Sequence, residues 1–425
     1  MKPLRIAFLK ATLHASGGLE KYCLRLYDAL SKRGHTVTIL STSSRTDLPV
    51  TKICCRLRPS ALNLLWFDYH CRQYLSAHPQ DVVIGFDRHF LPLTYYRAGN
   101  GCHAAYLARR AKESSMLKRL SFSLNPLHFL TLLSEQYTFE RTPAAHIICN
   151  SHLVEHEIEK YYPKTPRSSL TVIHNGVEWH EFEPHFQQKI SSPKDPASPL
   201  QLLFIGHEWE RKGLDRLLNA LGLIKEAFAK LAIAICEVPA KVRAPISTKP
   251  IVVTMGEERS ELELCRHEQI AVASFAKASK EIPFHLTAVG RELHPHRFVE
   301  LAKALHIEDK VTFVPEAQKS LPYYKAAQIA IIPSRYDPFA NVTLEALAMG
   351  LFVITTTANG GSEAITPNLN GIVLDENASS FDLSQAIVSA MSFTRDPNLP
   401  MAIRESVKDF DFSQKLEEYI RLIEQ

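Results

Sequence analysis

The sequence predicts an α/β protein built from two doubly wound domains. Two series of strand-like and helix-like segments alternate along the chain, one beginning at Leu4 and the other at Leu200. Such alternation predicts parallel sheets with helices on both faces. The chain has 425 residues, which is more than one hydrophobic core usually serves, so the two series are assigned to two domains.

The first series begins with the apolar run LRIAFL (Leu4–Leu9), which predicts a short buried strand. A glycine-containing loop follows, and apolar residues then recur at helical spacing from Leu19 to Leu30. Gly34 lies where such a helix would end, and the β-branched run TVTILS at 36–41 predicts the next strand. These segments form a βαβ unit, in which the two strands are expected to be parallel.

The second series predicts strands at 200–206, 284–290, 310–315, 329–334 and 351–357, with helices between them. The Pro- and Ser-rich stretch SSPKDPASP at 191–199 predicts an exposed connection between the domains. The predicted domains are therefore 1–190 and 200–405. An insertion is predicted at about 232–282, where a short βα connection would suffice. A final helix within 406–425 is expected to pack back on the first domain.

Composition and charge exclude several classes of protein. Hydrophobic residues make up 45% and charged residues 22%, which argues against disorder. The formal net charge of +4 is too small to indicate nucleic-acid binding. The cysteines form no C-x-x-C pair, which favours free thiols in a reducing compartment over a zinc cluster or disulfides. With no leader-like N-terminus and no apolar run of about 18 residues, we expect a cytoplasmic protein without a membrane span.

The stretch SRYDPFANVTLEALAMG at 334–350 places an acid on each side of a strand-to-helix turn. A helix starting at Asn341, capped by this asparagine, would point its first backbone N–H groups at an anion. Glu345 could accept hydrogen bonds from a ribose diol, and Asp337 could face another part of the same ligand. The pattern suits a ligand with phosphate between hydroxyl groups, and the alternative is a helix terminus with incidental acids.

Two other loops have features of an anion site. Arg211 and Lys212 follow a predicted strand end and could contact a diphosphate; surface charge is the alternative, which their place at the carboxyl end of a strand makes less favoured. Gly17 and Gly18 precede a predicted helix and would permit close approach of a ligand to the backbone, although a tight turn explains them equally well.

Together these motifs resemble the group 1 retaining glycosyltransferases of the two-domain GT-B fold, in which Rossmann-like domains face each other across a cleft. The resemblance rests on the acid-x7-Glu element, the G-x4-RKG-x-D-x-LL loop, VIHNGVEWHEF at 172–182, ICNS at 148–151 and NGGSEAI at 359–365. The segment VVIGFDRHFLPLTYYRAGNGCHAAYL at 82–107 is most similar to the lipopolysaccharide core glucosyltransferase I subgroup.

The resemblance implies an N-terminal acceptor-binding domain, a C-terminal nucleotide-sugar-binding domain, and roles for matching residues. Asp337 and His103 would be catalytic, and Asn100 and His103 would contact the acceptor. Two departures matter: Asp337 replaces the usual Glu, and Asn100 stands where the subgroup often has an acid, so a base at that position is lost. The implied donor-binding residues are Gly17, Gly18, Arg211, Lys212, Phe339, Ala340, Asn341 and Glu345.

The resemblance also implies the reaction. A hexose, with glucose expected, would pass from a nucleoside-diphosphate sugar, with UDP expected, to a glycan such as the lipopolysaccharide core, with retention of configuration. Metal independence is expected because Arg211 and Lys212 could take the place of a cation. Alternatives are another glycolipid or capsule acceptor, or a GT-B sugar-nucleotide epimerase. A solute-binding protein of two α/β lobes and a non-catalytic glycosyltransferase fold are further alternatives, which turnover of sugar nucleotides would exclude.

The segment 106–133 predicts contact with an anionic membrane surface. It carries Arg109, Arg110, Lys112, Lys118 and Arg119 against the single acid Glu113, interleaved with apolar residues. A lipid-linked acceptor would place the protein on the inner face of the plasma membrane as a peripheral protein. The alternative is an ordinary amphipathic helix that covers the acceptor cleft.

Overall fold

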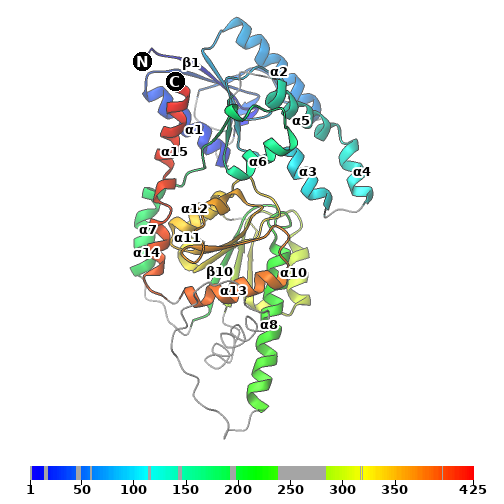
Figure 1. The fold of residues 1–425 in the computed structure, drawn as a ribbon, viewed down its shortest axis with the longest axis vertical. Coiled ribbons are helices and arrows are strands. Elements are labelled where there is room, and N and C mark those ends of the chain that lie inside the picture. The colour runs from blue at the N-terminus through cyan, green and yellow to red at the C-terminus, as the bar shows by residue number, and fades with distance from the viewer. Residues whose placement is uncertain are drawn as a thin grey trace.

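The computed structural model describes residues 2–13, 18–44, 49–57, 60–112, 116–141, 146–191, 198–237, 284–315, 317, 319–394 and 396–425. They form two lobes stacked along the long axis of the molecule (Figure 1). The first lobe comprises the described residues of 2–176 together with 412–425, and the second comprises those of 177–411. Each lobe has its own parallel sheet with helices on both sides, as the sequence predicted.

The first sheet has the strand order β5-β3-β1-β6-β7-β8-β9, and every neighbouring pair is parallel. Residues 6–9 of its central strand are completely buried, because helices cover both faces. The strands are β1 (Arg5–Leu9), β3 (Thr36–Ser41), β5 (Val50–Lys52), β6 (Val82–Gly85), β7 (Tyr95–Ala98), β8 (His146–Cys149) and β9 (Leu170–Val172), with a separate pair of β2 (Thr12–Leu13) and β4 (Ser43–Ser44).

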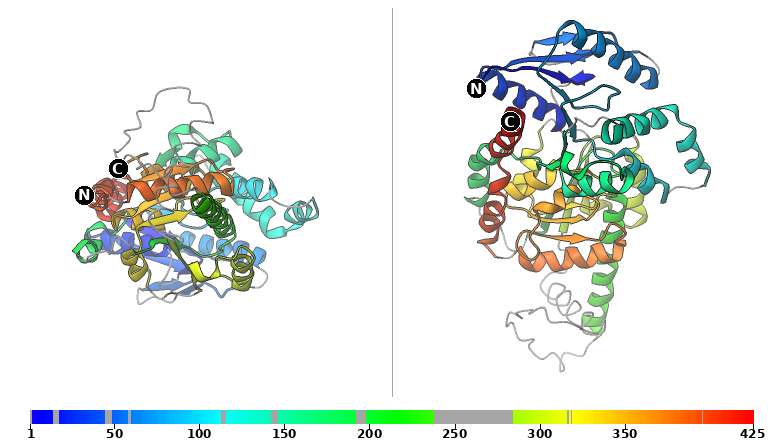
Figure 2. Two further views of the ribbon diagram at one scale, coloured as in Figure 1. Left: turned by 90° about the horizontal axis from the view of Figure 1, so that it is seen from below. Right: turned by 45° about the horizontal axis from the view of Figure 1, so that its top comes forward.

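The helices of the first lobe include one whose buried residues have the predicted spacing. In α1, Tyr22, Cys23, Leu26 and Leu30 face the sheet. The helices are α1 (Gly18–Lys32), α2 (Ser60–Ala77), α3 (His103–Lys112), α4 (Met116–Leu124), α5 (Pro126–Gln136), the π-helical η1 (Tyr137–Arg141), α6 (His152–Tyr161) and the 3-10 turn η2 (Arg167–Ser169). Helices α3 and α4 extend to one side of the lobe (Figure 2).

The second sheet has the order β12-β11-β10-β13-β14-β15 and is also parallel throughout. Its strands are β10 (Leu200–Ile205), β11 (Phe284–Val289), β12 (Val311–Val314), β13 (Ile329–Ile332), β14 (Phe352–Thr356) and β15 (Gly371–Leu374). Its helical segments are α7 (Trp179–Ser191), α8 (Leu214–Glu237), α10 (Pro295–Ala304), η4 (Glu308–Lys310), α11 (Leu321–Ala326), α12 (Asn341–Ala348), η5 (Gly360–Ala364), α13 (Ser380–Phe393), α14 (Leu399–Glu405) and η6 (Lys408–Phe410).

Two boundaries differ from the expected positions. Helix α7 lies within the predicted domain 1–190, yet its Trp179 and Phe186 belong to the hydrophobic core of the second lobe. Helix α8 continues to Glu237, which lies within the predicted insertion at about 232–282. Nearly all of the predicted insertion at about 232–282 lies outside the described residues.

The last helix, α15 (Phe412–Glu424), lies beside α1 in the first lobe (Figure 1). Its Tyr419, Ile420 and Ile423 enter the first-lobe core. The chain leaves the first lobe near Val177 and returns beside it, because the Val177 amide donates to Phe410 O at 2.9 Å and the Phe412 amide donates to Val177 O at 2.8 Å. The two passages between the lobes are therefore joined by hydrogen bonds.

Candidate active site between the lobes

The loop at 334–340, which joins β13 to α12, gathers the charged groups that the sequence singled out. Asp337 is buried, and its carboxylate accepts a hydrogen bond from the Lys212 ammonium. Arg211 Nη1 lies 3.5 Å from Asp337 Oδ2 and donates to Tyr336 O at 2.9 Å. Residues 125 positions apart therefore meet because β10 and β13 are neighbours in the sheet, with their carboxyl ends at the same edge.

The charges in this group support one another. Burial alone would raise the pKa of Asp337, but Lys212 and Arg211 hold it below its usual value. Burial likewise disfavours the charged form of Arg211, yet the neighbouring Asp337 and Glu208 raise its pKa. Asp337 and Arg211 are therefore both ionised at neutral pH, and the Lys212 and Arg211 side chains face the same carboxylate.

Helix α12 is capped differently from the prediction. Ala340 occupies the N-cap position and Asn341 the first helical position, so the expectation that Asn341 caps the helix is wrong. Asn359, in the loop after β14, binds the residue before the helix: its Oδ1 accepts from the amides of Ala340 and Gly361, both at 3.0 Å. The Phe339 amide donates to Asp337 Oδ1 at 3.1 Å. The amides of Phe339 and Ala340, two residues that the resemblance assigned to donor binding, thus have side-chain partners in this structure.

The other donor residues predicted on α12 have partners from both lobes. Asn341 Oδ1 accepts from Asn175 Nδ2 at 2.7 Å, and Asn175 Oδ1 accepts from the fully buried Arg97 at 2.7 Å. Arg97 also lies 3.6 Å from the centroid of the Tyr22 ring. A continuous chain of contacts therefore runs from the interior of the first lobe to the first residue of α12. Farther along α12, Glu345 Oε2 accepts from the Tyr324 hydroxyl at 2.7 Å.

The first lobe meets the 334–340 loop at the turn that follows β7. Gly101 has φ +69°, and a Cβ there would lie 2.4 Å from Tyr336 Oη and 2.5 Å from Pro338 Cγ. Only glycine permits this close approach with this backbone conformation. The Cys102 amide donates to Tyr336 Oη at 3.2 Å. The exposed Asn100 is in the same turn, and His103 begins α3 directly after it.

The His103 ring faces His128 of α5, with 3.0 Å between His103 Nε2 and His128 Nδ1. Burial, together with the positive charge of Arg88, lowers the pKa of His103 to about 4, so the ring is neutral at pH 7. The fully buried Glu135 accepts from the His103 amide and from Arg88 Nε, both at 2.7 Å, and thereby fixes the start of α3. Neither His128 nor Glu135 was singled out from the sequence.

Further contacts tie the lobes together around this centre. Ser151 Oγ donates to Pro338 O at 2.8 Å, and Glu157 Oε2 accepts from Tyr336 Oη at 2.9 Å. Arg109 pairs with Glu157 in its own lobe and, at 2.9 Å, with Glu376 in the other. Ser151 belongs to the motif ICNS, but no role for this residue was predicted from the sequence.

The structure describes one of the two glycines that were predicted to bind the donor. Gly18 is the first residue of α1, and Gly17 lies outside the described residues. The sequence-predicted residues that the structure brings together are therefore Arg211, Lys212 and the 334–340 loop on one lobe and Asn100 and His103 on the other.

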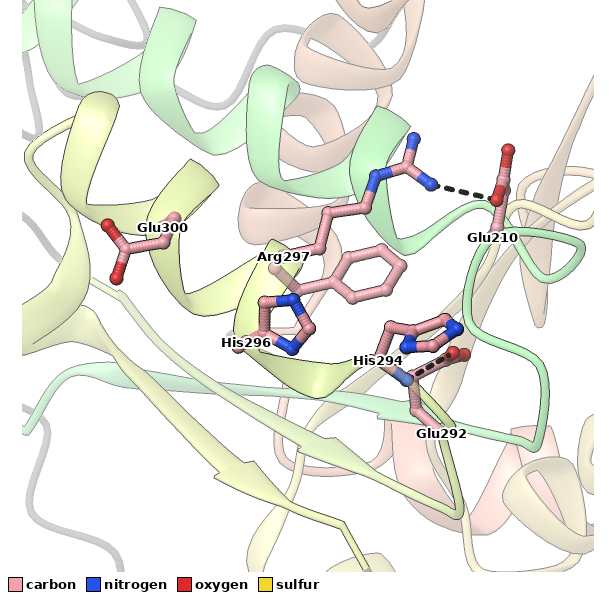
Figure 3. Close-up of a pocket in the computed structure, with 7 residues that line it drawn as sticks. Glu210, Glu292, His294, His296, Arg297 and Glu300 are labelled. Carbon is pink, nitrogen blue, oxygen red and sulfur yellow. Dashed lines mark hydrogen bonds and ion pairs between the residues drawn. The ribbon is translucent and has the colours of Figure 1, made fainter.

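Two pockets border this region. One, of about 500 Å³, lies on the second lobe and is lined by Glu210, Glu292, His294, His296, Arg297, Phe298 and Glu300. Figure 3 shows Arg297 turned towards Glu210, to which it donates at 2.9 Å. None of the sequence-predicted site residues lines it. The other, of about 250 Å³, lies between the lobes and includes Arg109, Glu157 and Glu376.

Comparison with known proteins agrees with this geometry. Residues 16–180 match the family model for Glycosyltransferase Family 4, and residues 247–409 match the model for glycosyl transferases group 1. The chain is a group 1 glycosyltransferase. The predicted enzyme class is thereby confirmed, and the alternative of a solute-binding protein is excluded.

Two relatives align with this glycosyltransferase over most of their length. Lipopolysaccharide glucosyltransferase WaaG of Escherichia coli K12 is 24% identical and aligns with 97% of this chain and 95% of its own length. An uncharacterised glycosyltransferase of Methanocaldococcus jannaschii is 23% identical, over 84% of this chain and 80% of its own.

Solved structures show the fold. The crystal structure of WaaG superposes with a TM-score of 0.68 at 21% identity, covering 98% of this chain and 99% of WaaG. Anabaena HepE in complex with UDP-glucose gives a TM-score of 0.60 at 14% identity and 99% coverage of both chains. The predicted GT-B fold is confirmed. Among the described residues, no helix combines the length and apolar character needed to cross a membrane.

Proposed function

We propose that this glycosyltransferase transfers glucose from UDP-glucose to a glycan of the lipopolysaccharide core, with retention of configuration at the anomeric carbon. The first lobe would bind the acceptor and the second the nucleotide sugar. The observation that carries the proposal is the convergence of Arg211, Lys212 and the 334–340 loop opposite the turn that bears Asn100 and His103.

The donor diphosphate would bind at Arg211 and Lys212. Together with Asp337 these cations leave one net positive charge, and the N-terminus of α12 adds partial positive charge. A leaving nucleoside diphosphate gains negative charge as the glycosidic bond breaks, so fixed cations beside it stabilise the transition state without a metal ion. Asp337 holds both cations in place, and its remaining acceptor capacity would serve the hydroxyl groups of the sugar. Glu345 would accept from the ribose, and Gly17 and Gly18 would approach the diphosphate from the first lobe.

His103 would contact the reacting sugar as a neutral imidazole. With its pKa lowered to about 4, the ring cannot supply a positive charge at pH 7, and its contact with His128 orients it. Asn100 would position the acceptor through hydrogen bonds, because an amide cannot act as a base. In a retaining reaction the acceptor attacks from the face that the diphosphate leaves, so a phosphate oxygen of the leaving group is the nearest base for the acceptor proton.

The donor and acceptor are inferred from relatives. WaaG is a lipopolysaccharide glucosyltransferase, and HepE was solved with UDP-glucose. The name of WaaG supports glucose as the sugar and lipopolysaccharide as the acceptor, and the HepE complex supports UDP-glucose as the donor. Another glycolipid or a capsule glycan as acceptor, and a sugar-nucleotide epimerase activity, stay as alternatives.

A membrane surface would be the place of the reaction. Helix α4 projects from the first lobe together with α3 (Figure 1). Met116 of α4 is 85% exposed and Phe129 of α5 is 58% exposed, and the basic residues Arg119 and Lys112 of the same segment are also exposed. Apolar side chains beside basic ones suit the surface of an anionic leaflet. We propose that 106–133 attaches the enzyme peripherally to the cytoplasmic face of the plasma membrane.

Turnover measurements test the enzymatic proposal. The purified protein is incubated with UDP-, GDP- and ADP-glucose, with and without truncated lipopolysaccharide, and release of nucleoside diphosphate is followed. We expect release from UDP-glucose that the acceptor increases. Arg211→Ala should lower it at least about 100-fold, as loss of one fixed charge-stabilising group does elsewhere. Arg297→Ala, which removes an exposed arginine of the same lobe, is the matched control. Conversion of UDP-glucose to an epimer without acceptor would instead support the epimerase.

Sedimentation with vesicles tests the membrane proposal. Vesicles containing an anionic phospholipid should retain the wild type, and the double variant Met116→Ser, Phe129→Ser should bind more weakly. Leu293→Ser is the control, because Leu293 is 86% exposed but lies on the second lobe. Equal retention of the double variant and the control would refute attachment through 106–133.

A further inference from the structure

Two histidines and a glutamate from opposite lobes converge at the edge of the candidate site. His152 begins α6 and His174 follows β9 in the first lobe, whereas Glu363 lies in η5 of the second. Each residue offers one possible ligand atom, and these atoms all lie within 4.8 Å of one another. His174 Nε2 is 2.7 Å from Glu363 Oε2, and the two imidazole rings have their centroids 5.6 Å apart.

The ligand set indicates which metal would bind. Two imidazole nitrogens and one carboxylate suit Zn²⁺, Co²⁺ or Ni²⁺, whereas Mg²⁺ and Ca²⁺ prefer oxygen ligands throughout. Ligand atoms around a tetrahedral Zn²⁺ are about 3.3 Å apart, given Zn–N and Zn–O distances of about 2.0 Å. Since these atoms lie within 4.8 Å of one another, each separation would need to shorten by about 1.5 Å at most.

Surrounding contacts orient the three groups. His152 Nδ1 lies 2.8 Å from Glu155 Oε2, which is the carboxylate–histidine arrangement that accompanies metal-ligating imidazoles and leaves the second ring nitrogen available. Glu363 accepts from the amides of His152 and Leu153 at 2.9 and 2.8 Å.

Access and surroundings also fit a metal site. The His152 side chain is about half-exposed, so an ion can enter and keep a water ligand. His174 is flanked by Phe339 and Phe410, with ring centroids 6.1 and 5.5 Å away, which limits its movement. An inter-lobe hydrogen bond between His174 and Glu363 alone would not require His152 to lie against both of them.

We propose that His152, His174 and Glu363 bind one transition-metal ion of the Zn²⁺ class that joins the two lobes. The site is not catalytic: the donor residues Arg211 and Lys212 are not part of it. Because Glu363 comes from the second lobe and both histidines come from the first, the bound ion holds the lobes together, and its affinity depends on their approach. The proposal does not rest on the identity of donor or acceptor.

The test uses the full chain, freed of metal with a chelator, and Zn²⁺ or Co²⁺ alone. Calorimetry should show one Zn²⁺ per chain, Co²⁺ should give the visible absorption of a low-coordinate complex, and Zn²⁺ should raise the thermal unfolding midpoint. His152→Ala and Glu363→Gln should each weaken binding by more than about 10-fold, a loss that even outer-shell changes can cause. His296→Ala, which removes a histidine of the pocket in Figure 3, should bind as the wild type does.

Three results would overturn the proposal. One is absence of stoichiometric binding of either metal to the wild type. Another is undiminished binding by His152→Ala, whose half-exposed position makes misfolding an inadequate explanation. Equal weakening by the His296→Ala control would likewise locate the metal elsewhere. The metal-binding results could still be interpreted if the protein failed to turn over UDP-glucose, because no step of the test uses a sugar nucleotide.

Discussion

Replacing Asp337 by asparagine removes the only carboxylate that contacts both Arg211 and Lys212 in the described part of the chain. The Lys212 side chain is 8% exposed, and it would keep its charge with no counter-charge beside it. Breaking a buried ion pair by removing one partner typically costs about 3–5 kcal/mol. Arg211 adds less, because it is more exposed and also bonds to Glu208. We expect Asp337→Asn to lower the free energy of unfolding by about 3 kcal/mol.

The assay is urea unfolding followed by tryptophan fluorescence. Trp209 and Trp179 both belong to the core of the second lobe, where Asp337 lies, so their signal reports on that lobe. The depressed pKa of Asp337 means that its stabilisation is complete above the unfolded-state pKa of about 3.9 and is lost as pH falls through the lower folded-state pKa. The difference between wild type and Asp337→Asn should therefore be constant near neutral pH and shrink in strong acid.

The control is Asp309→Asn, which breaks an exposed ion pair with Lys310 and should cost less than about 0.5 kcal/mol. Equal unfolding midpoints for Asp337→Asn and this control would refute the argument that Asp337 balances buried charge. If the proposed donor site is correct, UDP should stabilise Asp337→Asn more than the wild type, because the diphosphate supplies the missing negative charge.

Three further predictions concern substitutions in the first lobe. Gly101→Ala should destabilise it by about 1 kcal/mol through its positive φ, and should also weaken contact between the lobes, measured as faster proteolysis between them. Glu135→Gln should cost about 3 kcal/mol in thermal or urea unfolding, because Arg88 loses its buried counter-charge; no change would contradict the assigned charges. His103→Gln should reduce the loss of stability between about pH 6.5 and pH 4, since the folded wild type resists protonation that the unfolded chain accepts; an unchanged slope would place the pKa of His103 elsewhere.

The sheets were predictable because their strands are buried on both faces and read as continuous apolar runs. Residues 6–9 and 329–332 show this directly, since every one of them is buried. The same local patterns identified the strand ends, where Arg211 and Asp337 lie. Their neighbouring positions in the structure follow from strand order, which the alternation of strands and helices alone does not specify.

The capping and support of the site were not predictable from local sequence. Asparagine usually caps a helix, but Asn341 occupies the first helical position, and Asn359 binds the Ala340 amide from 19 residues farther along. Glu135 looks like an ordinary helical acid, and only the packing of α5 under α3 brings it to the His103 amide. Such contacts depend on tertiary structure, so residue type and spacing contain little information about them.

The return of α15 to the first lobe has a consequence for the order in which this protein matures on the ribosome. Tyr419, Ile420 and Ile423 complete the core around α1, yet they are synthesised after the whole second lobe. The first lobe therefore emerges first and closes its core last. A nascent chain that has not reached residue 423 exposes the apolar surface of α1 for the entire time that the second lobe takes to be made. Shielding of that surface by a chaperone during synthesis would matter more for this protein than for one whose N-terminal lobe folds on its own.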